Sequence, residues 1–355
     1  MLKIREHVNL FIFADIIQNQ EIVNKIELEQ IFESFSKLNV LIIGDVMVDA
    51  YVWGKVDRIS PEAPVPIVSC INRESRLGGA ANVALNIKSL GANPILCSVI
   101  GNDDKGKEFL NLLTEIQEEQ YGIVVSNKRR TTVKTRFISD NQHLIRVDEE
   151  DTHELADEIE LEFIDHIKSV IDKHEIHAII FEDYDKGVIT KNLIEEITNL
   201  ANKKEIPVAV DPKKRHYNDY KNVSLFKPNF KEFVEGSNLL LEKGDIQGLF
   251  DEAKKFQNEM GIKKLFITLS ELGVFISNEK TYEHIPAVVR QIADVSGAGD
   301  TVISVAALCL AAGMNTREIA AISNLAGGIV CEIPVVVPID KKQLLAESSK
   351  IIDKL

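Results

Sequence analysis

The stretch Asp294-Val295-Ser296-Gly297-Ala298-Gly299-Asp300-Thr301 lies directly before an apolar segment that has helical spacing. Its two glycines let the backbone turn sharply and approach a ligand closely. The N–H groups at the start of the following helix would then point outward and form an anion site. Asp300 admits two interpretations: it caps the helix, or it takes a proton from an attacking hydroxyl beside a bound phosphate.

Outward from this stretch, short β-branched runs alternate with helical segments along most of the chain. The pattern predicts strands over residues 40–43, 94–100, 178–181, 208–211, 223–226 and 264–269. It predicts helices over residues 80–90, 104–116, 191–203, 230–239, 300–312 and 316–331. Apolar strands that alternate with helices indicate an α/β fold with a parallel sheet covered on both faces.

Two segments depart from this alternation. Residues 50–71 and 132–148 alternate apolar and polar side chains around turns, which is typical of antiparallel hairpins with one wet face. We expect them to join into a small sheet that acts as a lid at the carboxyl edge of the main sheet. Residues 1–36 are predicted to be an N-terminal helical extension, and residues 37–355 to be the main domain.

Composition and charge exclude several classes of protein. The 355 residues include 55 acidic and 41 basic side chains, and the net charge of −14 repels nucleic-acid phosphates. No apolar run reaches the ~18 residues that cross a bilayer. The four cysteines show neither metal-ligand spacing nor a disulfide framework. We therefore expect a cytoplasmic protein with no nucleic-acid and no membrane partner.

Two further motifs could bind ligands. Gly78 and Gly79 allow a close approach at the start of a helix, where the amide of Asn82 can donate to and accept from vicinal hydroxyls of a ligand. The alternative is a simple glycine turn. Asn229 and Glu232 follow a strand and lie three residues apart on one helix face. They predict either a helix capping box or a pair of ligand-binding side chains.

Charged residues near the expected lid suggest an anionic substrate. Asp49 lies just past the first strand, where open α/β sheets bind ligands. In so acidic a chain, cations gathered at the lid and at strand ends could hold an anionic group, although each alone could be a solvated surface charge. These cations are Arg58, Arg136, Arg146, Lys186 and Lys213.

Together, these motifs resemble the signatures of the ribokinase-like (phosphofructokinase-B type) carbohydrate kinases. Residues 78–82, Gly-Gly-Ala-Ala-Asn, are similar to the first signature of that family, and residues 294–300 are similar to the second. The resemblance covers about residues 38–350. It implies a three-layer α/β/α domain with a mostly parallel sheet and a small β-sheet lid.

Residues 44–49, 58–66, 141–148 and 183–187 resemble the heptose-7-phosphate kinase branch of that family. This resemblance implies transfer of phosphate from ATP, with Mg²⁺, to O1 of D-glycero-β-D-manno-heptose 7-phosphate, towards ADP-heptose for lipopolysaccharide. In many relatives the kinase is the first half of a bifunctional protein whose second half is an adenylyltransferase. Because the chain ends after one kinase length, we expect a separate adenylyltransferase to act downstream. The family also implies a homodimer through the lid sheets.

The resemblance implies a role for each matching residue. Asp300 is the catalytic base, and the backbone of Gly297, Ala298, Gly299 and Asp300 is the anion hole. The substrate is held by Asp49, Gly78, Gly79 and Asn82, with Arg58, Arg136, Arg146 and Lys186 as further contacts. The nucleotide is held by Asn229, Phe230, Lys231, Glu232, Thr268, Ser270, Gly273 and Asn324, and Glu232 acts on Mg²⁺ indirectly.

Two departures from the family pattern concern a monovalent cation such as K⁺, for which the resemblance implies Asp294 and Ser296. Ser296 stands where threonine is usual, which keeps the hydroxyl. Residues 332–336, Glu-Ile-Pro-Val-Val, replace a loop that is rich in glycine and threonine in the family. The adenine side and the cation site are therefore expected to differ from those of typical members.

Two alternatives stay open at the level of sequence. The first is a kinase for another sugar or for a nucleoside, because a fold does not fix its substrate. The second is a regulator that binds a sugar or nucleotide without catalysis. The intact Asp300 and its glycine turn favour an enzyme, since a binding protein needs no base.

Overall fold

The computed structural model describes residues 25–114, 116–117, 122–140 and 142–352. Helix α2 (Lys25–Ser34) and a 3₁₀ turn (Phe35–Lys37) come first, and Leu28 and Phe32 of α2 are buried. Part of the predicted extension over residues 1–36 is therefore helical and packs on the core. The remainder of that prediction, over residues 1–24, lies outside the described residues.

The main sheet is mostly parallel, as predicted. Its strands in the described residues are β1 (Asn39–Gly44), β4 (Asn93–Gly101), β5 (Ile123–Ser126), β8 (Ala178–Glu182), β9 (Val208–Asp211), β10 (Leu225–Phe226), β11 (Lys264–Thr268), β12 (Val274–Ser277) and β13 (Tyr282–Ile285). Their spatial order is β13-β12-β11-β10-β9-β8-β1-β4-β5, and the pairs formed by β12 are antiparallel. The pattern of apolar strands and helices thus predicted the central strands of the sheet. It did not predict β5, β12 and β13, which lie towards the two edges of the sheet.

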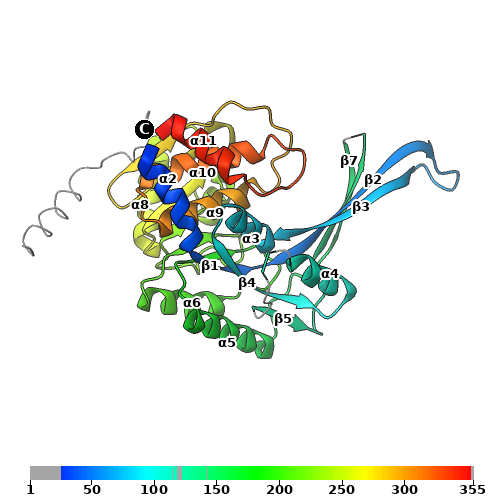
Figure 1. Ribbon diagram of the computed structural model, residues 1–355, viewed down its shortest axis with the longest axis horizontal. Helices are drawn as coiled ribbons and strands as arrows, with labels where there is room; N and C mark the ends of the chain where they lie inside the picture. Colours follow the sequence, from blue (N-terminus) through cyan, green and yellow to red (C-terminus); the bar gives the residue numbers. More distant parts are fainter. Residues whose placement is uncertain (1–24, 115, 118–121, 141, 353–355) are drawn as a thin grey trace, which may run out of the picture.

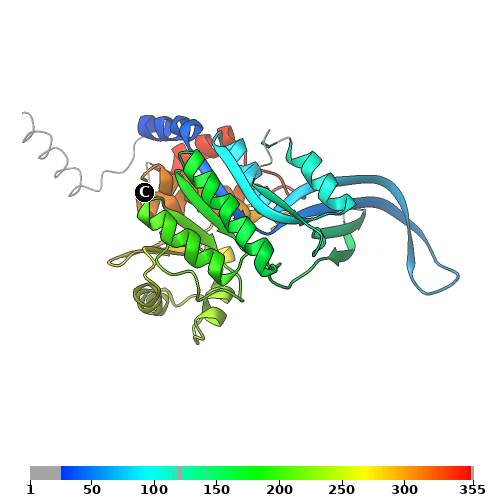
Figure 2. The same cartoon turned by 90° about the horizontal axis from the view of Figure 1, so that it is seen from below.

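Helices cover both faces of this sheet (Figures 1 and 2). One face packs against α2, α3 (Ala80–Ser89), α4 (Asp104–Leu113), α9 (Ala298–Ala311), α10 (Thr316–Val330) and α11 (Lys341–Ile352). The other face packs against α5 (Asp157–Lys173), α6 (Lys191–Lys203), α7 (Phe230–Gly236) and α8 (Ile246–Met260). In β1, Val40 and Ile42 point to the first layer, whereas Leu41 and Ile43 point to the second. This alternation confirms the three-layer α/β/α fold.

A second sheet of four strands forms the lid. It consists of β2 (Val46–Ile59), β3 (Pro66–Gly79), β6 (Val133–Ser139) and β7 (Gln142–Glu149), in the order β3-β2-β6-β7. Figure 1 shows the β2–β3 hairpin projecting from the body. The hairpin is longer than the predicted segment 50–71, because β2 begins directly after β1 and pairs with β3 as far as Gly79. The lid sheet therefore continues directly from the main domain, with no linker between them.

No helix among the described residues is long and apolar enough to cross a membrane.

Candidate active site

A pocket of about 270 Å³ lies between the lid sheet and the carboxyl ends of the central strands. We call it the lid pocket. It is lined by Met47, Asp49, Gly79, Lys134, Arg136, Arg146, Tyr184, Lys186, Ser296, Gly297, Asp300 and Val336. The first residues of α9, the turn after β8 and all four lid strands thus converge on one space.

Asp300 lies at the floor of the lid pocket and is 5% exposed. Its Oδ2 accepts a hydrogen bond from Nδ2 of Asn82, and its Oδ1 accepts one from the hydroxyl of Tyr184, both at 2.7 Å. The residue at the N-cap of α9 is Gly297, and no side chain caps this helix. The capping interpretation of Asp300 is therefore wrong. Its carboxylate is held by Asn82 and Tyr184 and lines the pocket.

Burial raises the pKa of Asp300 to about 6. The hydrogen bonds from Asn82 and Tyr184 lower this pKa, the charge of Asp211 raises it, and Lys227 lowers it. A base works best when its pKa is near the working pH. At neutral pH the carboxylate is ionised and can accept a proton from a hydroxyl placed beside it.

The glycine turn before Asp300 leaves backbone donors free. Gly297 has φ = +76°, which favours glycine, and a Cβ there would meet Val336 at 2.9 Å. The N–H of Ala298 bonds to the carbonyl of Val295, and that of Thr301 bonds to the carbonyl of Gly297. Among the described residues, the N–H groups of Gly297, Gly299 and Asp300 have no bonded partner and remain for an anion at this helix N-terminus. Of the four amides from Gly297 to Asp300 that were predicted to form the anion hole, the Ala298 amide is therefore the one that is already bonded.

The first glycine motif serves the same pocket. Asn82 is 1% exposed and contacts Asp300, which lies 218 residues further along the chain. A Cβ on Gly78 would lie 2.3 Å from Oδ2 of Asp49. Gly79 has φ = +60°, and a Cβ there would lie 2.4 Å from the carbonyl oxygen of Asp45. These glycines thus make room for the carboxylate of Asp49 and for the strand that carries it.

The lid presents a charged face to the pocket. Arg136 pairs with Asp49, and the charge of Asp49 raises the pKa of Arg136 against the effect of its burial. Lys134 pairs with Asp148 at 3.2 Å and with Glu150 at 3.4 Å.

Two more cations complete this face. Lys186 pairs with Glu150 at 2.8 Å, and Arg146 pairs with Asp148 at 2.8 Å. We call Lys134, Arg136, Arg146 and Lys186 the lid cations. Because these four side chains share three carboxylates, those of Asp49, Asp148 and Glu150, the network has one cation more than it has carboxylates.

Two predicted substrate cations lie elsewhere. Arg58 is exposed near the far end of β2, opposite Ile67 of β3, and does not line the lid pocket. Lys213 pairs with Glu232 at 2.9 Å and with Asp211 at 3.5 Å. Its place after the end of strand β9 was predicted correctly, but its side chain pairs with Glu232, a predicted nucleotide residue, and does not line the lid pocket.

Asn229 and Glu232 form the predicted capping box of α7. The Asn229 side chain accepts from the N–H of Glu232 at 2.9 Å, and Oε2 of Glu232 accepts from the N–H of Asn229 at 2.8 Å. The other carboxylate oxygen of Glu232 contacts Lys213. The capping interpretation is therefore confirmed, and the same carboxylate also belongs to a charged cluster.

That cluster adjoins the base. Lys227 pairs with Asp211 at 2.7 Å, and the two lysines, Lys213 and Lys227, lower the pKa of Asp211 although its burial raises it. The ammonium group of Lys213 lies 5.6 Å from the centroid of the Tyr184 ring. Tyr184 thus stands between Asp300 and the Lys213–Asp211–Glu232 cluster.

The remaining predicted nucleotide residues lie near the end of β11. Thr268 forms an isolated parallel bridge with Asn229. Ser270 (φ +54°) and Gly273 (φ +88°) bound a 3₁₀ turn, and a Cβ on Gly273 would lie 2.0 Å from the carbonyl oxygen of Ile285. Asn324 donates to the backbone carbonyl of Pro286 at 3.0 Å. Phe230 and Lys231 occupy the first turn of α7.

The residues predicted to hold a monovalent cation lie on the loop before α9. Oδ1 of Asp294 accepts from the N–H of Ser296 at 3.0 Å, and Ser296 lines the lid pocket. Among the described residues, no group of three or more His, Cys, Asp or Glu side chains is arranged to hold a metal ion.

The sequence motifs gave no role to four residues of the lid pocket: the apolar Met47 and Val336, and the polar Tyr184 and Lys134. Tyr184 lies within residues 183–187 but was assigned no role. Lys134 lies two residues before Arg136, on the same face of β6. The period of two along a strand is the signal that could have found it.

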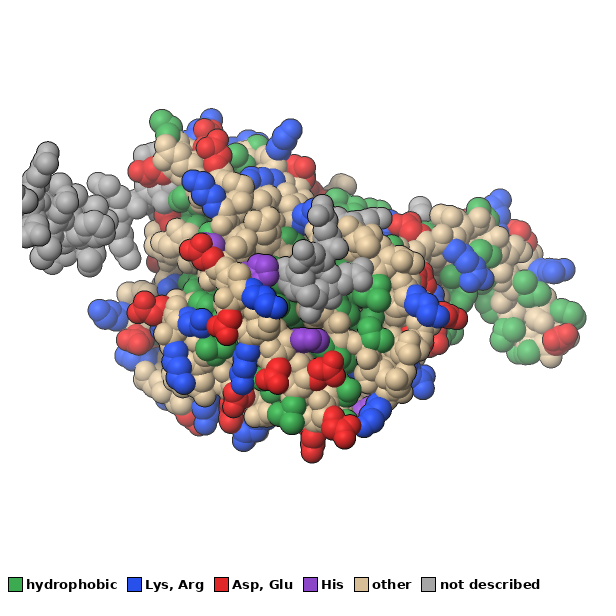
Figure 3. Space-filling view, turned by 60° about the horizontal axis from the view of Figure 1, so that its bottom comes forward, with side chains coloured by type: hydrophobic (Ala, Val, Ile, Leu, Met, Phe, Trp, Pro, Cys, Tyr) green, Lys and Arg blue, Asp and Glu red, His purple; other side chains and the backbone are tan. Residues whose placement is uncertain are grey.

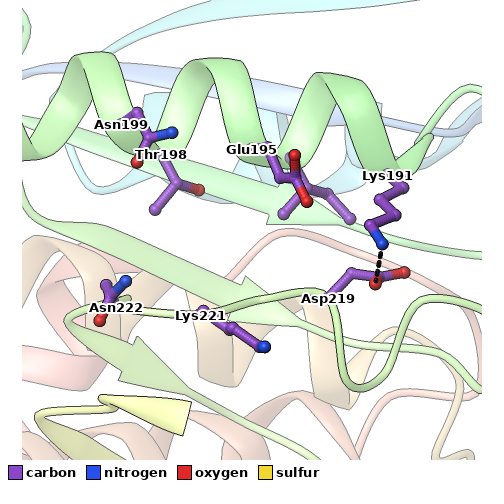
Figure 4. Close-up of a pocket in the computed structure, with 8 residues that line it drawn as sticks. Lys191, Glu195, Thr198, Asn199, Asp219, Lys221 and Asn222 are labelled. Carbon is purple, nitrogen blue, oxygen red and sulfur yellow. Dashed lines mark ion pairs between the residues drawn. The ribbon is translucent and has the colours of Figure 1, made fainter.

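Figure 4 shows a different surface hollow, between α6 and the loop over residues 219–222. Its charged side chains, Lys191, Glu195, Asp219 and Lys221, are balanced in sign. Lys191 lies 3.9 Å from Asp219. This hollow offers no arrangement comparable to the base and anion site of the lid pocket.

The fold and the lid pocket suit a carbohydrate kinase, since a buried carboxylate lies beside a helix N-terminus that can bind an anion. Residues 37–335 match the profile of the pfkB family carbohydrate kinases. The chain therefore belongs to this family.

Curated relatives and solved structures agree with this membership. The bifunctional protein HldE of Aliarcobacter butzleri is 39% identical over 294 residues, which cover 83% of this chain and 61% of the relative. The HldE protein of Geobacter sulfurreducens is 37% identical over 303 residues, 85% of this chain and 61% of the relative. The chain thus spans about 61% of the length of these relatives.

Among solved structures, phosphofructokinase-2 from Escherichia coli in complex with fructose-6-phosphate has a TM-score of 0.69 at 17% identity, covering 88% of this chain and 99% of its own. Ribokinase of Arabidopsis thaliana, complexed with ribose and ATP, has a TM-score of 0.65 at 15% identity, covering 87% and 98%. These similarities establish the shared fold.

Proposed function

We propose that the protein transfers phosphate from ATP to O1 of D-glycero-β-D-manno-heptose 7-phosphate. The observation that carries this proposal is the meeting of a buried base, Asp300, and the lid cations in one pocket. The base supports phosphoryl transfer to a hydroxyl, and the cations support a substrate that already bears a phosphate. The similarity to bifunctional HldE proteins supports a heptose phosphate.

The charge of the chain makes the lid cations informative. A net charge of −14 repels a sugar phosphate, whose phosphate carries about two negative charges near neutral pH. Lys134, Arg136 and Lys186 have side chains that are only 12–15% exposed, so their contacts with a phosphate would be poorly screened. Two or three charge-assisted hydrogen bonds would hold the distal end of a seven-carbon sugar.

The chemistry follows from the floor of the pocket. The sugar ring would lie between Asp49 and Asn82, with O1 towards Asp300. Asp300 would take the proton of the O1 hydroxyl as that oxygen attacks the γ-phosphorus of ATP, the bond from this phosphorus to the bridging oxygen would break, and ADP would leave. The N–H groups of Gly299 and Asp300 would stabilise the charge on the transferred group.

The nucleotide would lie on the side of Asn229, Glu232 and Thr268, with Ser270, Gly273 and Asn324 towards its base. Both carboxylate oxygens of Glu232 already accept hydrogen bonds, from Asn229 and Lys213, so Glu232 fits a contact to hydrated Mg²⁺ better than direct ligation. Mg²⁺ would enter with the phosphates and neutralise their charge. K⁺ remains a proposal for the loop of Asp294 and Ser296.

Assembly is proposed to be a homodimer through the lid sheets. Ile59, Val65, Ile71, Ile145 and Val147 are 43–68% exposed on the lid. Figure 3 shows hydrophobic side chains gathered at the projecting end of the lid. Such faces are rarely left in water. Light scattering at micromolar concentration should show a dimer, and a stable monomer would remove this proposal. A cytoplasmic site and a separate downstream adenylyltransferase stay part of the proposal.

The decisive assay is ADP release with ATP and Mg²⁺ across a panel of free and phosphorylated sugars. The proposal expects heptose 7-phosphate to have a kcat/KM far above that of heptose, ribose or fructose. Equal turnover of free and phosphorylated sugars would favour a general sugar kinase of the same family. The absence of ADP release with every sugar would favour a regulator that only binds them.

A further inference from the structure

The turn after β8 carries two side chains of the lid pocket. Tyr184 donates its hydroxyl to Oδ1 of Asp300 at 2.7 Å. Lys186, two residues later, lines the pocket as one of the lid cations and pairs with Glu150. The turn thus contacts the base with one residue and the proposed phosphate site with another.

This turn lies outside any helix or strand, so its backbone needs other partners. Asp185 has φ = +55° and Gly187 has φ = +87°, and both values are in the left-handed region. A Cβ on Gly187 would lie 1.9 Å from the carbonyl oxygen of His153. A backbone of this shape persists only where the surroundings hold it.

Asp45 supplies that support. It follows β1 directly and is 1% exposed. Its Oδ2 accepts from the N–H groups of Tyr184 at 2.8 Å and Lys186 at 3.1 Å, and its Oδ1 accepts from the N–H of Val188 at 3.0 Å. One buried carboxylate therefore gathers three alternate amides, a concave arrangement of donors that suits an anion.

We propose that Asp45 is a positioning residue that couples catalysis to recognition of the substrate phosphate, because it fixes Tyr184 against the base and Lys186 among the lid cations in a single turn. The sugar-phosphate part of this inference rests on the proposed function. The contact between Tyr184 and the base does not depend on which sugar is bound.

The geometry separates three kinds of effect. Tyr184→Phe keeps the ring beneath Lys213 but frees Oδ1 of Asp300, so it should act on kcat. Lys186→Met removes a lid cation, so it should act mainly on kcat/KM for a phosphorylated sugar. Asp45→Asn replaces one acceptor oxygen with a donor that faces backbone N–H groups, so it should act on both.

A pH profile distinguishes positioning from general stability. The charged and titratable groups around Asp300 are Tyr184, Asp211, Lys227 and the buried Glu182. Of these, the Tyr184 hydroxyl lowers the pKa of Asp300 through its hydrogen bond. Its removal in Tyr184→Phe should therefore move the acid limb of kcat to higher pH. A variant that only lowers stability would leave the position of that limb unchanged.

Two matched variants control for the loss of buried groups. Tyr217→Phe removes a hydroxyl from a tyrosine that packs against Phe226 and Phe256 in the core. Asp103→Asn alters another carboxylate that accepts backbone N–H groups, those of Gly106 and Thr131, at the start of α4. Neither residue lines the lid pocket.

The experiment has two arms. In the first, amide hydrogen exchange of the unaltered protein, without substrate, should show the N–H groups of Tyr184, Lys186 and Val188 protected like those of the neighbouring strand β8. If these N–H groups exchanged as fast as those of an open loop, the role of Asp45 would be overturned. Because this arm uses the unaltered protein, it remains decisive even if Asp45→Asn fails to fold.

The second arm is steady-state kinetics with the sugar that gives the fastest ADP release and with its phosphorylated or unphosphorylated counterpart. Tyr184→Phe should lower kcat by about 10- to 100-fold, since small misplacements of a base are costly. Asp45→Asn should lower kcat and also reduce the preference for the phosphorylated sugar by about tenfold or more. An effect of Asp45→Asn no larger than that of Asp103→Asn would overturn the proposal. If another sugar gives the highest kcat/KM, the proposed substrate is wrong. The effect of Tyr184→Phe on kcat can still be measured with that sugar and still tests the role of Tyr184.

Discussion

The floor of the lid pocket, formed by Asp300, and its wall, formed by the lid cations, hold their charges in different ways. On the floor, the carboxylate of Asp300 is bonded to two neutral donors, Asn82 and Tyr184. On the wall, each lid cation pairs with a carboxylate. Arg136 pairs with Asp49, and the others pair with Asp148 or Glu150. The negative charge of Asp300 on the floor is therefore not paired with a cation, whereas the positive charges of the lid cations are largely compensated by carboxylates.

This difference separates chemistry from recognition. Neutral donors fix the Asp300 carboxylate without cancelling its charge, so it can still accept a proton. Paired cations are held in place before the substrate arrives, and a phosphate must compete with their carboxylate partners. Variants on the floor should therefore change kcat, and variants on the wall should change which sugar is preferred.

The largest effect is expected on the floor. Asp300→Asn keeps the size of the side chain and removes the base, so kcat should fall by ~10²–10⁴-fold, with a much smaller change in substrate affinity. Steady-state kinetics and a thermal unfolding curve of the variant measure both properties. Turnover within a few-fold of the unaltered enzyme would remove Asp300 from the mechanism.

The next effect is expected on the nucleotide side. Glu232→Gln keeps an oxygen for the capping box but replaces the charge beside Lys213. The proposed role in organising hydrated Mg²⁺ predicts a higher Mg²⁺ requirement and a large fall in kcat, whereas a purely structural cap predicts little change. A Mg²⁺ titration distinguishes them. Glu318→Gln, in the equivalent capping box of α10, is the matched control.

A smaller effect is expected on the wall. Lys134→Met or Lys186→Met removes one charge-assisted contact, each of which is worth about 1.5–3 kcal/mol. The ratio of kcat/KM for the phosphorylated over the unphosphorylated sugar should fall by roughly 10- to 100-fold. Lys191→Met, at an exposed position on α6, should leave that ratio unchanged. An unchanged ratio in both lid variants would show that the phosphate binds elsewhere.

The mildest test changes only the pH. Burial raises the pKa of Asp300 to about 6, and the base must be ionised to work. The activity should therefore be constant well above pH 6 and fall about tenfold per unit below it, as the carboxylate takes up a proton. Asp300→Asn should lose this acid limb. A limb near pH 4 in the unaltered enzyme would assign it to a solvated carboxylate instead.

Motifs near a turn or a helix start were predictable from the sequence, because their chemistry is local. The glycine turn before Asp300 and the capping box of Asn229 and Glu232 are of this kind. Asn82 and Asp300 were each identified as candidates, but their direct contact depends on how α3 and α9 pack. The family resemblance placed both residues in one site, Asn82 on the sugar and Asp300 as the base, but it did not predict their direct contact.

Residues whose role depends on side-chain direction were less predictable. Lys213 follows a strand end, as many ligand-binding residues do, yet its ammonium group turns towards Asp211 and Glu232. Arg58 was grouped with the other cations because it lies on a lid hairpin, but β2 is long enough to carry it away from the pocket. Local sequence reports neither the length of a paired strand nor the direction of a long side chain.

The central claim is that one pocket binds the 7-phosphate of the sugar at the lid cations while the phosphate of ATP is transferred to a hydroxyl beside Asp300. The most direct test is ³¹P NMR of the product formed from heptose 7-phosphate, ATP and Mg²⁺. The account predicts a bisphosphate in which the original ester is unchanged and the new phosphate is on O1. A new phosphate on any other oxygen, or no product under conditions in which a free sugar is phosphorylated, would contradict it.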